Sequence, residues 1–196
     1  MKKTIAAVVC AAAAALSVQA HAEDAKVLRM ACESTYAPFV FFDSETGKLK
    51  GFEIDLLEYV AKEMGRKLEV TNMGFDAIIP SMLTGITDVG ASAFTITPER
   101  AKRVLFSKPY YISGLSILVR AEDKDKIKSV KDIENCTICA QIGTSGSMRA
   151  AKVPGAKVRN FNTINDAYLE LGNKGCKAVI TDRPVTAYFL AARPET

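Results

Sequence analysis

The sequence predicts an α/β protein in which helices cover both faces of a mostly parallel sheet. Strand-like and helix-like patterns take turns in the order strand, helix, strand, helix, strand between residues 27 and 91. A second set of such patterns begins past the segment 107–111. Alternation of this kind favours parallel strands joined by helical crossovers. We therefore expect two α/β lobes joined by a hinge, lobe 1 at residues 23–111 and lobe 2 at residues 112–196.

The elements of lobe 1 follow from local spacing. Residues 53–64 are expected to form a helix because apolar side chains recur there on one stripe, and Gly65 follows as a C-terminal stop. Thr97 and Pro98 mark another helix start, with a capping hydroxyl and a first-turn proline. The remaining elements are expected at 27–31, 68–70 and 89–91 for strands and at 75–83 for a helix.

Lobe 2 shows the same two kinds of pattern. Ser129 with Asp132, and Thr163 with Asp166, have the spacing of a capping box, and the second pair opens a helix that runs to Gly172. Strand patterns stand at 115–119 and 178–181, and a final helix is expected to open at residues 182–184.

Residues 1–22 have the composition of a secretory signal peptide. Lys2 and Lys3 precede an apolar, alanine-rich run at 5–18, and the small residues Ala20 and Ala22 precede the expected cleavage point after Ala22. The run of fourteen residues is shorter than the roughly 20 that a membrane span needs. We expect the segment to be cleaved and the mature protein to be exported without an anchor.

The charge balance argues against a nucleic-acid partner. The chain carries 26 basic and 22 acidic residues, and removal of Lys2 and Lys3 leaves 24 against 22, a net charge of +2. No basic stripe interleaved with aromatic residues is present. The only histidine, His21, leaves with the signal peptide, which excludes a Ser-His-Asp triad and a His-ligated metal from the mature chain. We expect a monomer with no metal and no cofactor.

Four cysteines remain in the mature chain, as an oxidising compartment allows. The spacing of Cys136 and Cys139 suits a redox or zinc site, but the pair lies in a strand-like run, and one pair is too few for structural zinc. We expect a disulfide between Cys136 and Cys176, at the starts of two neighbouring strands. The states of Cys32 and Cys139 are left open.

Arg100 falls in the first turn of the helix that opens at Thr97. A cation there opposes the helix dipole, so the position favours a nearby anion. The guanidinium fork binds a carboxylate with two hydrogen bonds, and free main-chain N–H groups at the helix start would add donors. The alternative is a surface arginine paired with Glu99 or Glu58.

Two further positions suggest contacts to a small zwitterion. The loop at 143–147 lies between a strand and a helix, and its N–H groups can bind an anion, although an ordinary turn would look the same. Asp182 follows the strand at 178–181, at the edge where α/β sheets bind ligands, and its carboxylate can accept an ammonium group. The alternative is that Asp182 only caps the following helix.

The segment 51–56, with the sequence GFEIDL, is followed by Val60, Ala61 and Met64. In this it resembles the signature of the bacterial extracellular solute-binding proteins of family 3. Segments at the family's spacing cover nearly the whole mature chain, at 35–39, 95–100, 106–110, 141–144 and 180–182.

The resemblance implies a type II periplasmic-binding-protein fold that closes on a free amino acid and delivers it to the permease of an ABC transporter. Arg100, Thr95, Thr144 and Ser145 would hold the α-carboxylate. Asp182, Ser92 and Ala93 would receive the α-ammonium group. The ligand side chain would lie between Tyr36 and Phe75 and face Glu33; the alternatives are core packing for the aromatic pair and solvation for Glu33.

The position of Glu33 predicts a basic or amide ligand, because an apolar side chain would leave this carboxylate unpaired. A competing function is a periplasmic cyclohexadienyl or arogenate dehydratase, since some relatives on this scaffold are such enzymes, and Glu33 would be its acid. Relatives also continue beyond Thr196 to complete lobe 2, so the resemblance predicts a truncated C-terminal part and weakened binding.

Overall fold

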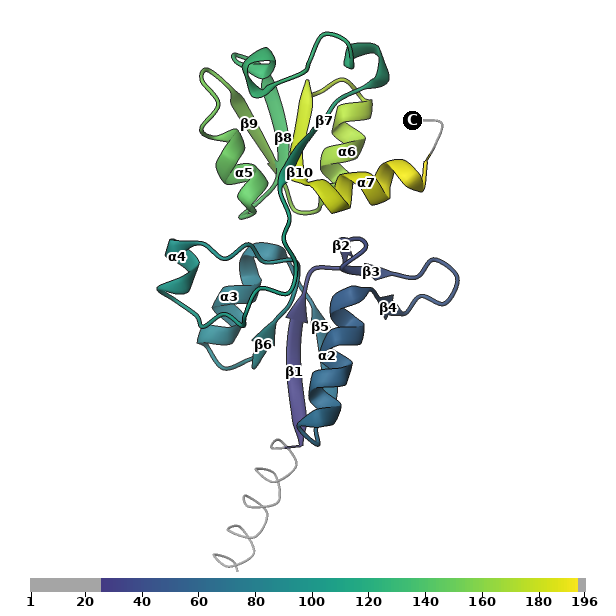
Figure 1. Cartoon of the computed structure of the whole chain (residues 1–196), viewed down its shortest axis with the longest axis vertical. Helices are drawn as coiled ribbons and strands as arrows, with labels where there is room; N and C mark the ends of the chain where they lie inside the picture. Colours follow the sequence, from purple (N-terminus) through teal and green to yellow (C-terminus); the bar gives the residue numbers. More distant parts are fainter. Residues whose placement is uncertain (1–25, 194–196) are drawn as a thin grey trace, which may run out of the picture.

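The structure is a computed structural model that describes residues 26–193. Two bodies of sheet and helix lie one above the other, joined by the connector that leads from α4 to β7 (Figure 1). We call the body with β1–β6 lobe 1 and the body with β7–β10 lobe 2. The expected signal peptide, with its cleavage point after Ala22, and residues 194–196 lie outside the described residues.

Lobe 1 is built on a parallel sheet with helices on both faces, as predicted. In its central strand, Met30 packs with Ile54 of α2 on one face, and the next residue, Ala31, packs with Ile78 of α3 on the other. The strand order is β5-β1-β6. The elements are β1 (Val27–Cys32), α2 (Phe52–Glu63), β5 (Lys67–Asn72), α3 (Phe75–Leu83), β6 (Val89–Gly90) and α4 (Pro98–Ala101).

Between β1 and α2 in the chain, three short strands form a small antiparallel sheet that the sequence analysis did not predict. It consists of β2 (Thr35–Tyr36), β3 (Val40–Phe42) and β4 (Leu49–Lys50). Strands this short leave too few residues for an alternating pattern. Gly51 links this sheet to α2 with a φ of 130°, and a Cβ there would lie 2.3 Å from the Phe39 carbonyl oxygen, so only glycine fits.

Lobe 2 holds a mixed sheet in the order β7-β10-β8-β9, with only β7 antiparallel to its neighbour. Ile138 and Ile180 pack with Ala150 of α5, whereas Cys139 and Val179 face α6 and α7 on the opposite face. Figure 1 shows α5 on one side of the sheet and α6 with α7 on the other. The elements are β7 (Leu115–Leu118), η1 (Ala121–Asp123), η2 (Val130–Ile133), β8 (Thr137–Gln141), α5 (Ser145–Ala150), β9 (Lys157–Phe161), α6 (Ile164–Gly172), β10 (Ala178–Asp182) and α7 (Arg183–Ala191).

The predicted caps hold at the N-termini of the short helices. Ser129 and Asp132 make both bonds of a capping box. Thr163 accepts from the Asp166 N–H, but the Asp166 carboxylate accepts from the Thr163 hydroxyl instead of its N–H, so the second box is incomplete. Thr97 caps α4 by accepting from the Arg100 N–H at 3.3 Å.

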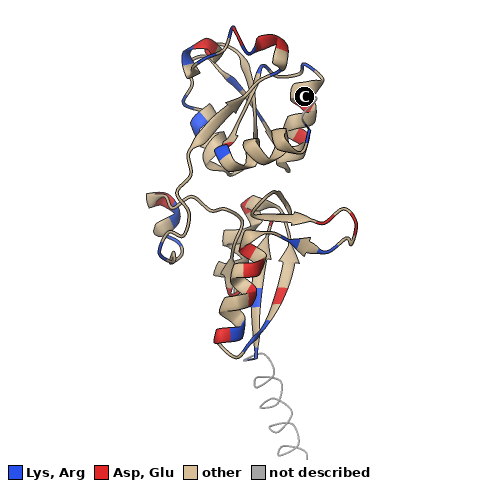
Figure 2. Cartoon of the chain, turned by 45° about the vertical axis from the view of Figure 1, so that its right-hand side comes forward, with Lys and Arg blue, Asp and Glu red and all other residues tan. Residues whose placement is uncertain are grey.

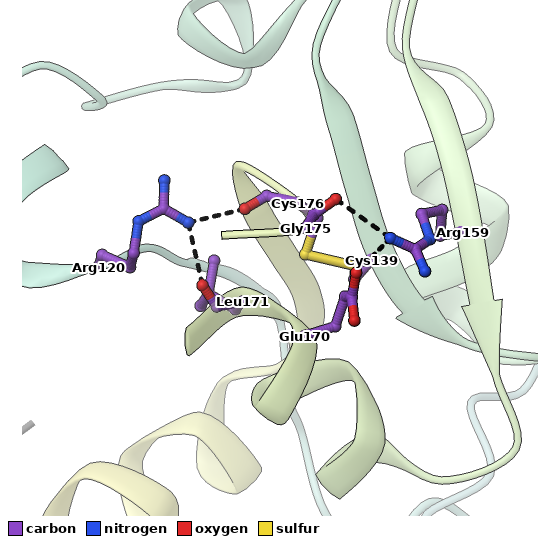
Figure 3. The surroundings of a disulfide bond; sticks show 7 residues. All are labelled: Arg120, Cys139, Arg159, Glu170, Leu171, Gly175 and Cys176. Atoms are coloured by element: carbon purple, nitrogen blue, oxygen red, sulfur yellow. Dashed lines mark hydrogen bonds and ion pairs between the residues drawn. A yellow bond between two sulfur atoms is a disulfide. The ribbon is translucent and has the colours of Figure 1, made fainter. Parts of the chain in front are cut away.

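The predicted disulfide partner of Cys176 was wrong. Cys176 pairs with Cys139, at a Cα–Cα distance of 6.0 Å, and Cys136 is a half-buried free thiol. Side chains three residues apart on an extended strand point to opposite faces, so Cys139 faces α6, where Cys176 lies, and Cys136 does not. Figure 3 shows Arg120 and Arg159 donating to carbonyls beside this disulfide. Cys32 is a buried free thiol whose pKa burial raises to about 12.

Charged side chains of both signs are mixed over the two lobes, without a stripe of one sign in the view of Figure 2. None of the helices within residues 26–193 combines the length and the apolar character that crossing a membrane requires.

Candidate functional site

A cavity of about 560 Å³ lies at the boundary between the lobes, within the usual size for small-molecule sites. Lobe 1 contributes Ala93 and Thr95 to its lining, and lobe 2 contributes Ser145 and Asp182. The cavity continues along the connector, residues 104–115. Strands β8 and β10 end at Gln141 and Asp182, so the carboxyl edge of this sheet faces lobe 1, as expected for a ligand-binding α/β sheet.

Arg100 is a buried cation without a carboxylate at ion-pair distance among the described residues. Its Nη1 donates to the Thr95 carbonyl at 2.7 Å, and its Nη2 donates across the lobe boundary to the Gly143 carbonyl at 2.9 Å. The guanidinium also lies over the stacked rings of Phe75 and Phe94, 5.3 and 5.1 Å from their centroids. The alternative of a surface arginine paired with Glu99 or Glu58 is therefore wrong.

Asp182 ends β10 and stands at the N-cap position of α7, but its side chain makes no capping hydrogen bond. It is only 8% exposed and accepts a hydrogen bond from the Tyr36 hydroxyl of lobe 1. Burial raises the pKa of Asp182, whereas the Tyr36 hydrogen bond and the charge of Arg100 lower it. The carboxylate is thus held at the lobe boundary by a hydroxyl group of the other lobe.

Tyr36 of lobe 1 packs against lobe 2 and is hydrogen-bonded to it. Its ring belongs to the apolar cluster that contains Ile164 and Val179, and its hydroxyl lies 3.0 Å from the Thr181 hydroxyl in addition to its bond with Asp182. Phe75, its expected partner in an aromatic sandwich, instead stacks on Phe94 with ring centroids 4.4 Å apart. The Tyr36 hydroxyl therefore bonds to Asp182, and the Phe75 ring lies against the Arg100 guanidinium.

Glu33 is buried at 4% exposure, so the alternative of a solvated carboxylate is wrong. It accepts hydrogen bonds from the Thr35 N–H and hydroxyl, and from Gln141 Nε2 of lobe 2 at 2.9 Å. Burial raises the pKa of Glu33 against the effect of these bonds. Gln141 also donates to the Asn162 carbonyl, while its buried Oε1 has no partner in the described part of the chain.

Sequence reasoning missed Gln141 as a site residue. The available signal was its place at the carboxyl end of β8, the same edge at which Asp182 ends β10. Sequence reasoning also gave Glu53 no role beyond its place in the segment 51–56. In the structure, each of its carboxylate oxygens lies 2.9 Å from the Ala93 nitrogen. Nothing in the local pattern distinguished it from the exposed acids of the same helix.

The other predicted residues lie around the same boundary. The Ser92 hydroxyl is bonded to the backbone of Glu33, and the Thr95 hydroxyl donates to the Ser145 hydroxyl of lobe 2 at 3.2 Å. The Thr144 side chain caps α5 and donates to the Gln141 carbonyl, so its hydroxyl is already engaged. No cluster of three or more metal-ligating side chains occurs in residues 26–193.

Residues 28–188 match the sequence model of the bacterial extracellular solute-binding proteins, family 3. A probable histidine-binding protein of Campylobacter jejuni is 33% identical over 168 residues, which cover 86% of this chain and 64% of the relative. ABC transporter arginine-binding protein 1 of Escherichia coli is 29% identical, with 89% of this chain and 70% of the relative covered. The chain spans about two thirds of the length of the curated relatives that it matches.

Solved structures show the same similarity. A truncated, arginine-bound form of ArgBP from T. maritima superposes with a TM-score of 0.84 at 37% identity, over 88% of this chain and 81% of that protein. An ancestral amino-acid-binding protein, described as a precursor of cyclohexadienyl dehydratase, superposes with a TM-score of 0.81 at 40% identity, over 85% and 74% of the two chains.

Proposed function

Because the chain belongs to the bacterial extracellular solute-binding proteins, family 3, with their type II periplasmic-binding fold of two α/β lobes, we propose that it binds a free amino acid between its lobes. One observation carries this proposal: Arg100 and Asp182 are opposite charges buried at the lobe boundary, with Asp182 in the cavity lining, and no ion pair joins them in the described residues. Unpaired buried charges are costly, and a zwitterion between the two would neutralise both.

The proposed ligand replaces groups of the protein itself. Its α-carboxylate accepts the Arg100 hydrogen bonds that the Thr95 and Gly143 carbonyls accept in this structure, with a further contact from Ser145. Thr144, whose hydroxyl and N–H bond to the Gln141 carbonyl, supports this loop. Its α-ammonium group takes the place of the Tyr36 hydroxyl at Asp182, beside Ser92 and Ala93. Hydrogen bonds in which both partners are charged are stronger than the bonds to neutral carbonyl and hydroxyl groups that they replace.

The proposed ligand is a basic or amide amino acid. Its side chain lies between Tyr36 and Phe75 and donates to Glu33, a buried carboxylate whose present donors are all neutral. Relatives named as histidine-binding and arginine-binding agree with this class.

We further propose export to the periplasm with cleavage after Ala22, function as a monomer, and delivery of the ligand to an ABC-transporter permease. Closure uses the connector between the lobes, with the lobe boundary at residues 111 and 112. The closed form would present both lobes to the permease at once, which an empty, open form would not.

Thermal shift with the twenty amino acids, ornithine and citrulline tests the proposal. A true ligand at about 100 times its Kd should raise Tm by about 5–10 °C, and Arg100→Ala should abolish the shift. Shifts with leucine alone, and none with lysine, arginine, histidine or glutamine, would overturn the basic or amide class. If no amino acid raised Tm, the proposal that the protein binds amino acids would be wrong.

The dehydratase alternative requires Glu33 to donate a proton to a leaving hydroxyl group. Glu33 instead accepts hydrogen bonds from Thr35 and Gln141, an arrangement that favours an acceptor. We propose binding without turnover. Incubation with arogenate, followed by assay for phenylalanine, separates the two functions, since only the enzyme would form product.

A further inference from the structure

Glu53 is a fully buried carboxylate behind the wall of the cavity, in the first turn of α2. Each of its oxygens lies 2.9 Å from the Ala93 nitrogen, and the Tyr110 hydroxyl donates to Oε1. Among residues 26–193 no lysine or arginine forms an ion pair with it. Burying a carboxylate whose donors are all neutral costs folding free energy. We therefore consider what its contacts with Ala93 and Tyr110 do for the proposed site.

The first contact acts on the loop that carries the proposed ammonium and carboxylate contacts. Ala93 has a φ of 50°, a left-handed conformation that a residue with a side chain rarely adopts. Ala93 lines the cavity, and two residues later the Thr95 carbonyl accepts from Arg100. The Glu53 carboxylate accepts the N–H of the strained residue and so holds the loop in this shape.

The second contact acts on the connector between the lobes. Tyr110 lies in the connector that leads to β7, and its ring packs against Phe52, the first residue of α2, at a centroid distance of 5.7 Å. Burial, followed by the charge of Glu53, raises the pKa of Tyr110, so the hydroxyl remains a donor. One carboxylate therefore holds both the ligand loop and the connector.

We propose that Glu53 is a positioning residue: it keeps Ala93 in the left-handed conformation that amino-acid binding requires and, through Tyr110, ties the ligand loop to the connector. This inference rests on the proposed function for its effect on affinity, but not for its effect on the loop. Glutamine keeps a single acceptor oxygen, so one of the two carboxylate oxygens that lie 2.9 Å from the Ala93 nitrogen becomes an NH2 group, and the side chain no longer carries the charge that strengthens these bonds.

The test compares Glu53→Gln and Tyr110→Phe with Glu58→Gln, a matched change of an exposed acid on the same helix. Hydrogen exchange is measured without ligand on peptides spanning residues 91–95 and 27–32, and affinity is measured by calorimetry with the amino acid that shifts Tm most. Glu53→Gln should speed exchange at 91–95 about 10-fold or more, leave 27–32 unchanged, and weaken affinity about 10-fold to 100-fold. Tyr110→Phe should keep 91–95 protected, and Glu58→Gln should match wild type.

A rescue separates positioning from general support of the fold. Glycine adopts the left-handed conformation without strain, so Ala93→Gly added to Glu53→Gln should recover at least about threefold of the lost affinity. Unchanged exchange at 91–95 in Glu53→Gln, or an equal rise in both peptides, would overturn the inference, as would the absence of rescue. If wild type binds no amino acid, the proposed function fails, and the exchange measurement still decides the role of Glu53.

Discussion

Buried charges at the lobe boundary are satisfied by groups of the chain itself. Asp182 accepts from Tyr36, Glu33 accepts from Gln141, and Arg100 donates to the Gly143 carbonyl, each across the two lobes. These bonds join lobe 1 to lobe 2. A ligand that replaces them gains only the difference between its own bonds and those lost, so single side chains at this boundary should shift affinity in either direction.

Arg100→Ala should abolish the carboxylate contact and leave lobe 1 folded. Truncating one partner of a buried charge pair costs roughly 2–5 kcal/mol, or about 30-fold to several thousand-fold in affinity. Calorimetry with the preferred amino acid measures the loss. Arg103→Ala, an exposed arginine just past the same short helix, is the control and should bind as wild type. Affinity within threefold of wild type for Arg100→Ala would remove Arg100 from the site.

Tyr36→Phe should act in the opposite direction. Loss of the hydroxyl leaves Asp182 without its donor in the empty protein, so the empty form is destabilised and an incoming ammonium group meets no competitor. We expect a lower Tm without ligand and an affinity higher by about 10-fold, from the loss of one hydrogen bond to a charged group. Tyr111→Phe, whose ring is half exposed, should change neither. Weaker binding by Tyr36→Phe would show that the hydroxyl contacts the ligand instead.

At the scale of elements, the position of a side chain on its strand decides its partner. Consecutive residues on β8 point to opposite faces, so Ile138 packs against α5 and Cys139 against α6. The loop before β10 brings Cys176 over the α6 face, where Arg120 donates to its carbonyl (Figure 3). The disulfide therefore fastens the N-terminal end of β10 to the middle of β8.

Removal of this disulfide should destabilise lobe 2. The bond closes a sequence separation of 37 residues, for which loop-closure entropy gives about 3–4 kcal/mol. We expect the double variant Cys139→Ala/Cys176→Ala to lose about that much free energy of unfolding in urea. Cys136→Ser is the control and should retain wild-type stability. A peptide map without reduction that joined Cys136 to Cys176 would contradict the pairing.

At the scale of the whole molecule, burial raises the pKa of three carboxyls, Glu33, Glu53 and Asp182. The sequence contains no histidine within the described residues, so carboxyls carry the titration between about pH 7 and pH 4, and burial extends the titration of these three upward in that range. In that range the folded state retains protons that the unfolded state has lost. The free energy of unfolding of the empty protein should therefore rise as pH falls toward about 4.

Ligand binding should have the opposite pH dependence. Asp182 must be ionised to accept an ammonium group, so affinity should fall as pH drops through its raised pKa. Tm without ligand and Kd, both measured from pH 7 to pH 4.5, test the two trends together. A Tm that falls along with affinity over this range would show that the three carboxyls are not the groups that titrate.

The sequence by itself determined the family, the alternation of strands and helices, and the caps at Thr97 and Ser129, because each depends on spacing within a few residues. It also predicted that Arg100 and Asp182 belong to a ligand site, since a cation in a first helical turn and an acid at a strand end are local signals. Only the tertiary structure decided that Cys139 is the partner of Cys176, that Gln141 reaches Glu33, and that Glu53 holds Ala93. These pairs are between 37 and 108 residues apart in the chain, and their contacts depend on which faces the packed lobes bring together.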